Sequence, residues 1–218
     1  MKRIRYQESE AVARQYARGY MAKCAKAAEF TRTTIAEALD KKGIKYASSA
    51  RAKDANSLAR KLRDLRKASL PLKHLIPLIG TGQDPDRIRD LAGARVSLYF
   101  PSDWALVEAQ IFDRFKNVTV KEHPETARKP PSRKRFQGYV ARHYYIDSRL
   151  GLRVELQVAS ALTHAWMEVD HDLVYKPGRK SLDASELAIL DGLNGITTAG
   201  DAILDGLKVR LLQRRVIR

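Results

Sequence analysis

The spacing of apolar residues predicts helices at both ends of the chain, with strands and helices between them. A first helix is expected from about Tyr6 to Asp40, because this stretch is rich in good helix formers and ends in Lys41, Lys42 and Gly43, a common stop signal. Apolar or β-branched runs predict strands at residues 44–50, 94–100, 117–121 and 152–158, and another that carries His143. Internal helices are expected at about 54–67 and 102–115.

The end of the chain, from Ala184 onward, has the pattern of a long amphipathic helix or a pair of helices. Leucine and isoleucine give it an apolar stripe, and its last residues, KVRLLQRRVIR, are basic. Such a helix either caps the domain or makes a contact between subunits. The sequence leaves both possibilities open, so a homo-oligomer is one of the expected states.

Composition restricts the compartment. The single cysteine, Cys24, excludes an internal disulfide and fits a reducing environment. No apolar run is long enough to cross a bilayer, and the first residues, MKRIRYQESE, lack the apolar centre of a secretory signal. We therefore expect a cytoplasmic protein with no membrane partner.

Net charge indicates the kind of partner. The 218 residues include 41 Lys and Arg against 25 Asp and Glu, a net charge of +16. Such an excess favours a polyanion, whether nucleotide phosphates, RNA or an anionic surface. Charge alone does not choose among them.

A first group of polar residues lies in RAKDANSLARK and comprises Arg51, Lys53, Ser57 and Lys61. Arg51 and Lys53 lie on one side of an extended lead-in, and Ser57 and Lys61 share one face of the helix that follows. The start of that helix carries a partial positive charge. The group is therefore suited to hold a polyphosphate, although an ordinary basic helix has the same appearance.

A second group lies in DLAGAR, where Asp90 precedes a buried strand that carries Arg95. A carboxylate at the mouth of a strand, beside a phosphate site, is a natural ligand for Mg²⁺. The planar guanidinium of Arg95 is suited to stacking on a base or pairing with phosphate.

A third group follows in GYVARH and VELQ. Glu155 and Gln157 lie two residues apart on a strand and must share a face, which is costly unless they meet a ligand, a metal, each other or solvent. Tyr139 is suited to stack on a nucleobase beside the basic tract at residues 122–137. Glu155 could bind a metal or act as a general base if it lies near Asp90.

In order and spacing, these groups resemble the synthetase domain of the RelA/SpoT family, and in size the small alarmone synthetases. Residues 51–61 fit R-x-K-x-x-x-S-x-x-x-K, residues 90–95 fit D-x-x-G-x-R, and VELQ fits V-E-x-Q. GYVARH fits G-Y-x-S-x-H except at Ala141, and HAWMEVDHDLVYK is similar to W-A-x-x-E-H-x-x-x-Y-K, with Asp170 in place of glutamate. The resemblance covers residues 44–176.

The resemblance implies a fold and an organisation. It implies an α+β domain with a mixed β-sheet flanked by helices, as in nucleotidyltransferase-like domains. The chain then divides into an N-terminal helical arm at 1–43, the synthetase domain at 44–176 and a C-terminal helical segment at 177–218.

The resemblance also implies a reaction, in which pyrophosphate passes from ATP to the 3′-hydroxyl of GDP or GTP and AMP is released. Arg51 and Arg95 would then hold the adenine of ATP. The residues implied for the ATP phosphates are Lys53, Ser57 and Lys61. Those implied for Mg²⁺ are Asp90 and Glu155, with Glu155 also a candidate base. Those implied for the acceptor are Tyr139, His143, Gln157, Lys129, Lys134 and Arg135.

Two departures from the family pattern concern the acceptor. Ala141 replaces a serine, and Ala159 stands where the family often has arginine. The same chemistry on an adenine nucleotide or on the 3′ end of tRNA is therefore an alternative, as is a non-catalytic RNA- or nucleotide-binding module. That last alternative leaves Asp90 and Glu155 unexplained, because acids in a phosphate site repel the ligand unless a metal intervenes.

A His-Asp pair at His171 and Asp172 looks like the metal-binding pair of the family's hydrolase domain. Here it lies in the closing helix of the synthetase pattern, and no histidine cluster precedes it. We therefore expect synthesis without hydrolysis.

Overall fold

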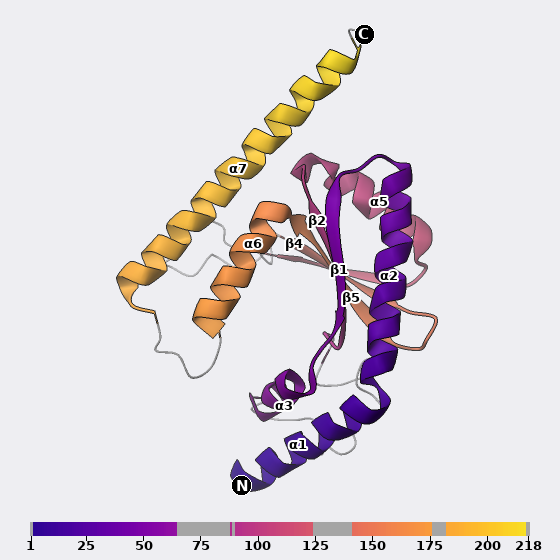
Figure 1. The fold of residues 1–218 in the computed structure, drawn as a ribbon, viewed down its shortest axis with the longest axis vertical. Helices are drawn as coiled ribbons and strands as arrows, with labels where there is room; N and C mark the ends of the chain where they lie inside the picture. The colour runs from indigo at the N-terminus through magenta and orange to yellow at the C-terminus, as the bar shows by residue number, and fades with distance from the viewer. Residues whose placement is uncertain (1, 65–87, 89, 124–140, 176–181, 217–218) are drawn as a thin grey trace.

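A mixed five-stranded sheet forms the centre of the molecule (Figure 1). The computed structural model describes residues 2–64, 88, 90–123, 141–175 and 182–216. The strands are β1 (Tyr46–Ala52), β2 (Ala92–Leu98), β3 (Val118–His123), β4 (Ala141–Asp147) and β5 (Arg153–Ser160). Their order is β1-β2-β5-β4-β3; β2 and β5 pair in parallel, and the other neighbours pair antiparallel. The mixed sheet of the expected α+β fold is confirmed.

The helices precede, interrupt and follow the sheet. They are α1 (Lys2–Gly19), α2 (Met21–Lys41), α3 (Ala55–Asp64), η1 (Pro101–Asp103), α5 (Trp104–Arg114), α6 (Ala161–Asp170), η2 (His171–Tyr175) and α7 (Ala184–Val216). The expected first helix is two helices, because the chain turns at Tyr20 directly after Gly19, a poor helix former. At the other end, α7 is one continuous helix and not a pair. The expected extension of α3 to Lys67 lies outside the described residues.

The hydrophobic core lies between one face of the sheet and helices α2 and α5. On β2 every second residue is buried, from Ala92 to Leu98, which is the alternation of a strand with one face in the core. From α5, Val107 and Ile111 are fully buried. Trp104 and Phe115, which share their helical spacing, pack against the same core from its margin. This packing leaves the opposite face of the sheet available for polar residues.

Helices α6 and α7 lie on that opposite face, away from α2 and α5 (Figure 1). Helix α6 starts directly after β5, where the hydroxyl of Ser160 accepts a hydrogen bond from the backbone N–H of Thr163 at 2.9 Å. The indole N–H of Trp166 donates to the carbonyl of Leu190 at 3.0 Å and ties α6 to α7. The part of this face that α6 leaves open holds the polar residues singled out from the sequence.

Within the described ranges, no helix has both the length and the apolar character needed to cross a membrane.

Candidate active site

Strand register brings the predicted residues together in two rows across the open face of the sheet. One row follows directly paired positions on β1, β2, β5 and β4: Ser49, Arg95, Gln157 and His143. The adjacent row lies two residues further along each strand and also joins directly paired positions: Arg51, Gly93, Glu155 and Tyr145. Residues that were far apart in sequence therefore face one cleft. Its lining includes Ser49, Arg51, Asp90, Gly93, Arg95, Glu155, Gln157 and Glu168.

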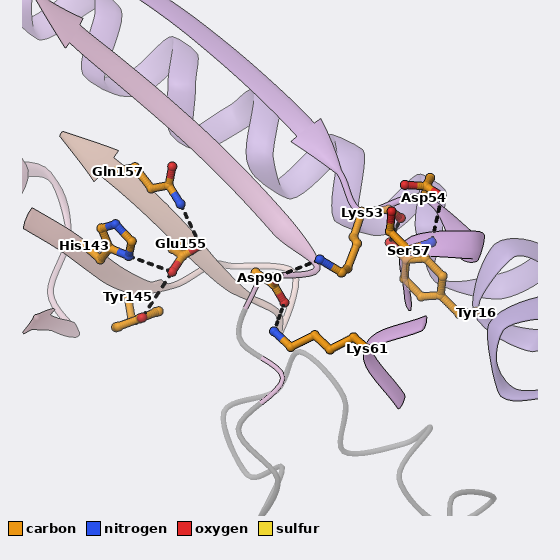
Figure 2. Close-up of polar contacts among 10 residues, drawn as sticks. All are labelled: Tyr16, Lys53, Asp54, Ser57, Lys61, Asp90, His143, Tyr145, Glu155 and Gln157. Atoms are coloured by element: carbon orange, nitrogen blue, oxygen red, sulfur yellow. Dashed lines mark hydrogen bonds and ion pairs between the residues drawn. The ribbon is translucent and has the colours of Figure 1, made fainter. Parts of the chain in front are cut away.

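At one end of the cleft, Asp90 holds two lysines. Its Oδ2 accepts from Nζ of Lys53 and its Oδ1 from Nζ of Lys61, both at 2.7 Å (Figure 2). Burial alone would raise the pKa of Asp90, but the charges of Lys61 and Lys53, and the hydrogen bonds they donate, lower it to about 2. At neutral pH the group is thus a carboxylate between two ammonium groups, with net charge +1.

The start of α3 is capped within the chain itself. Asp54 accepts from the backbone N–H of Ser57 at 2.9 Å, and hydrogen bonds from the Ser57 hydroxyl and backbone lower the pKa of Asp54 (Figure 2). Asp54 is therefore the N-cap of α3. The structure therefore brings Lys53 and Lys61 to Asp90, whereas Ser57 contacts Asp54.

The backbone next to Lys53 is held by the N-terminal arm. The hydroxyl of Tyr16, on α1, donates to the carbonyl of Lys53 at 2.8 Å. Helix α1 also contacts α3, where Arg63 pairs with Glu10 of α1 at 2.8 Å. Helix α1 thus supports the segment that carries both lysines.

In the middle of the cleft, Glu155 accepts three hydrogen bonds from side chains (Figure 2). His143 Nδ1 lies 3.0 Å and the Tyr145 hydroxyl 3.1 Å from Oε1, and Gln157 Nε2 lies 3.1 Å from Oε2. Burial alone would raise the pKa of Glu155, but the hydrogen bond and charge of His143, with the Tyr145 hydroxyl, lower it. Glu155 is therefore a buried carboxylate at neutral pH, and the three hydrogen bonds fix its orientation.

Sequence reasoning missed Ser49, which lines the cleft beside Arg95, and also Tyr145 and Glu168. Tyr145 lies two residues after His143 and so shares its strand face, a periodicity that would have identified it. Glu168, near the end of α6, pairs with Arg95 at 2.5 Å and lines the cleft. Motif comparison pointed instead to Asp170, and only the packing of α6 over β2 brings Glu168 to Arg95.

The side chain of Arg142 lies on the other face of the sheet. Its guanidinium pairs with Glu108 of α5 at 2.7 Å and lies over the ring of Trp104. The hydroxyl of Tyr144 donates to the same Glu108 at 3.0 Å. This group is separated from the cleft by the sheet.

Some predicted site residues cannot be compared with the structure. Tyr139, Lys129, Lys134 and Arg135 lie outside the described residues. The cationic tract that was expected to contact the acceptor falls largely in the same range.

The histidines of α6 and η2 differ in environment. His164 is buried and its Nδ1 lies 2.7 Å from the Ser97 hydroxyl, and burial, with the charges of Arg95 and His143, lowers the pKa of His164 to about 3. The neutral imidazole of His164 thus links α6 to β2 through its hydrogen bond with Ser97. His171 is exposed and Asp172 half-buried, with 3.8 Å between Nδ1 and Oδ1.

The cleft combines one buried carboxylate, Glu155, and one half-buried carboxylate, Asp90, with two lysines and two arginines. Mg²⁺ is usually held by one or two carboxylates together with substrate phosphates, and lysine and arginine neutralise phosphate charge. Among the described residues there is no group of three or more His, Cys, Asp or Glu side chains able to hold a metal alone. The arrangement is therefore suited to a metal that arrives with a polyphosphate.

Comparisons with known proteins agree with this chemistry. A family profile described as "Region found in RelA / SpoT proteins" matches residues 50–180, more than half of the chain. Among solved structures, small alarmone synthetase 1 from Bacillus subtilis bound to its product pppGpp is 20% identical, with a TM-score of 0.65 over 91% of this chain and 99% of that one. Comparison with curated proteins gives no match.

Two further structures have the same fold. Small alarmone synthetase 2 from Bacillus subtilis is 18% identical, with a TM-score of 0.62 over 89% of this chain and 99% of that one. A GTP pyrophosphokinase family protein from Streptococcus pneumoniae is 17% identical, with a TM-score of 0.62 over 91% and 96%. Family and fold together define an enzyme of the pyrophosphotransferase class. The chain belongs to the RelA/SpoT family, and its fold is that of the small alarmone synthetases.

Proposed function

We propose that this enzyme is a synthetase without hydrolase activity that transfers pyrophosphate from ATP to the 3′-hydroxyl of GDP or GTP. The acceptor oxygen bonds to the β-phosphorus of ATP, the bond from that phosphorus to the α-β bridging oxygen breaks, and AMP leaves with the bridging oxygen. The hydroxyl proton passes to a base. The observation that supports this most is one cleft that holds two carboxylates, the half-buried Asp90 and the buried Glu155, beside Arg51 and Arg95.

On the donor side, Arg51 and Arg95 hold adenine between them, because they lie diagonally across β1 and β2 on the open face. Lys53 and Lys61 neutralise the ATP phosphates, and to do so they exchange Asp90 for phosphate oxygens. Ser57, at the capped start of α3, adds a hydroxyl to that side. Transfers of this type depend mainly on positioning and charge neutralisation.

Mg²⁺ fits the same residues. Asp90 and Glu155 are both ionised at neutral pH, and when Asp90 loses its lysines to the phosphates its oxygens become available to a cation. Held there, the ion would supply positive charge against the negative charge of the phosphates. Glu155 Oε1 is also the candidate base for the hydroxyl proton, since His143 and Tyr145 keep it ionised and oriented.

On the acceptor side, His143 and Gln157 line the row next to Glu155. Tyr139 is proposed to stack on guanine, and Lys129, Lys134 and Arg135 to bind the acceptor phosphates. The buried Ala141 and Ala159, without the polar groups of the family pattern, keep an adenine nucleotide or the tRNA 3′ end as alternative acceptors. A cytoplasmic location and a division at residues 43/44 and 176/177 belong to the same proposal.

A turnover assay tests the proposal. Purified protein with ATP and Mg²⁺ is given GMP, GDP, GTP, adenine nucleotides or bulk tRNA, and AMP release and the labelled product are followed. We expect a 3′-pyrophosphorylated guanine nucleotide, lost in Glu155→Gln but retained in Glu108→Gln. Glu108 is a matched control because it is also a partly buried, paired glutamate, on the opposite sheet face.

Other outcomes separate the alternatives. Label on tRNA or on an adenine nucleotide would keep the mechanism and change the acceptor. No transfer from folded protein, with Asp90→Asn binding nucleotide as well as or better than the natural chain, would support the non-catalytic binding module. Hydrolysis of the labelled product by the same protein would contradict the absence of hydrolase activity.

A further inference from the structure

Strand β3 places a lysine on the face of the sheet that carries the cleft. Val118 and Val120 pack against the hydrophobic core. Thr119 and Lys121 alternate with them along the strand and so face the opposite, open side. Thr119 is exposed and Lys121 is half-buried. Lys121 lies outside the motifs that the sequence shares with the RelA/SpoT family, so no role follows for it from them.

Strand register continues one row of the cleft onto β3. Lys121 is directly paired with His143, and His143 is directly paired with Gln157. His143 Nδ1 lies 3.0 Å from Oε1 of Glu155, so the row turns toward that carboxylate (Figure 2). Two strand spacings, about 10 Å, separate the backbone of Lys121 from that of Gln157. The row that begins at Ser49 on β1 therefore ends at Lys121 on β3.

The two rows carry no acid between Glu155 and Lys121. Apart from Glu155, their residues on β5, β4 and β3 are Gln157, His143, Tyr145, Thr119 and Lys121. In the order of the strands, Lys121 lies on the side of Glu155 away from Arg51 and Arg95. Positive side chains therefore lie on both sides of this carboxylate, and an anion at β3 would meet a lysine and, within these rows, no acid.

In the proposed reaction, the two nucleotides approach Glu155 from opposite sides. ATP occupies the β1 and β2 side, where Arg51 and Arg95 line the cleft. The acceptor then lies over β4 and β3. Its 3′-hydroxyl and its 5′-phosphates leave opposite sides of the ribose, so a hydroxyl placed at Glu155 directs the phosphates toward the edge strand β3. Lys121 is the lysine that the two rows present at that edge.

We propose that Lys121 binds the 5′-phosphates of a free acceptor nucleotide whose 3′-hydroxyl lies at Glu155. Lysine carries a compact charge on a flexible four-carbon stem, which suits the terminal phosphates of a di- or triphosphate. The terminal nucleotide of an RNA has only one phosphodiester charge at this position, so a free nucleotide gains more from the contact. The inference rests on the proposed function for the place of the acceptor, and it adds a residue that recognises the acceptor phosphates.

Binding without turnover tests this contact. The full-length protein is saturated with Mg²⁺ and an ATP analogue whose α-β bridging oxygen is replaced by carbon, which fills the donor side and blocks transfer. Calorimetry then measures the Kd of GTP, GDP and guanosine, with the corresponding adenine compounds in parallel. Lys121→Ala should raise the Kd of the di- and triphosphates about 10-fold and leave that of the nucleoside unchanged, because only the phosphates lose a charged hydrogen bond.

Two further variants separate the contact from a general loss of charge. Lys116→Ala is the matched control, because Lys116 is an exposed lysine between α5 and β3 and its removal lowers the net charge equally. It should leave every Kd unchanged. Lys121→Arg keeps the positive charge and should hold the Kd of the di- and triphosphates within about 3-fold of the natural value. Circular dichroism should show that all three variants are folded.

Turnover distinguishes failure of this inference from failure of the proposed function. In the transfer assay, Lys121→Ala should raise KM for the acceptor and leave KM for ATP unchanged. Transfer with an unchanged acceptor KM, an equal loss for guanosine and GDP, or a loss confined to ATP or to tRNA would overturn the role of Lys121 and leave the reaction standing. Absence of transfer, with phosphate-dependent binding still lost in Lys121→Ala, would refute the reaction and support the phosphate contact.

Discussion

Replacing Asp90 by asparagine should destabilise the protein in the absence of any ligand. The carboxylate lies between Lys53 and Lys61 at 2.7 Å from each, and asparagine keeps the shape but leaves two ammonium groups without a counter-charge. Lowering the pKa of Asp90 from 3.8 to about 2 corresponds to about 2 kcal/mol in the free energy of unfolding at neutral pH. For a chain of this size such a loss lowers Tm by roughly 4–8 °C.

The effect should depend on pH with a definite sign. Because the folded-state pKa of Asp90 is depressed, its contribution is complete well above the unfolded pKa of 3.8 and is lost as pH falls through about 2. The difference in free energy of unfolding between the natural chain and Asp90→Asn should therefore be constant from pH 7 to pH 5. At pH 3 it should be roughly half as large.

Urea unfolding followed by circular dichroism, in EDTA and without nucleotide, measures this difference. Asp147→Asn is the control, because Asp147 pairs with Arg153 at 2.7 Å on the surface and an exposed pair contributes about 0.5 kcal/mol. The reasoning is refuted if Asp90→Asn costs no more than Asp147→Asn at pH 7, or if its cost is the same at pH 7 and pH 3.

Two further predictions concern the cleft. Tyr145→Phe removes a hydrogen-bond donor from Glu155 and so raises the pKa of Glu155, which should move the acid limb of the kcat/KM profile to higher pH. Tyr144→Phe, on the other face of the sheet, is the control and should leave the acid limb in place. Equal shifts in the two variants would contradict the assignment of Glu155. Glu168→Gln removes a negative charge from beside Arg95, so ATP should bind about 2–5-fold more tightly, as measured by calorimetry. Weaker binding would instead mean that the carboxylate of Glu168 is needed to orient Arg95.

Several features of the site could be predicted from local sequence. The period of two along a strand puts Glu155 and Gln157 on one face, and this is observed. A helix was expected to begin at about residue 54, and Asp54 caps its start. The motif order also indicated that Asp90 and Glu155 belong together, and they line one cleft.

Other features required the folded chain. Periodicity did not predict the break between α1 and α2 at Tyr20. It also left open whether α7 is one helix or two, because both features depend on packing. The attachment of Lys53 and Lys61 to Asp90 joins residues 37 and 29 positions apart in sequence. The contact of Glu168 with Arg95 spans 73 positions.

The sequence by itself thus determined which residues point to the same side of an element, because that information repeats every two or 3.6 residues and needs no neighbour. Only the tertiary structure decided which partners these residues meet. Strand order, register and the angle at which α6 crosses the sheet set those distances, and they result from packing of the whole core. The contact of Glu168 with Arg95 was decided in this way, and so was the exposure of one side of α7.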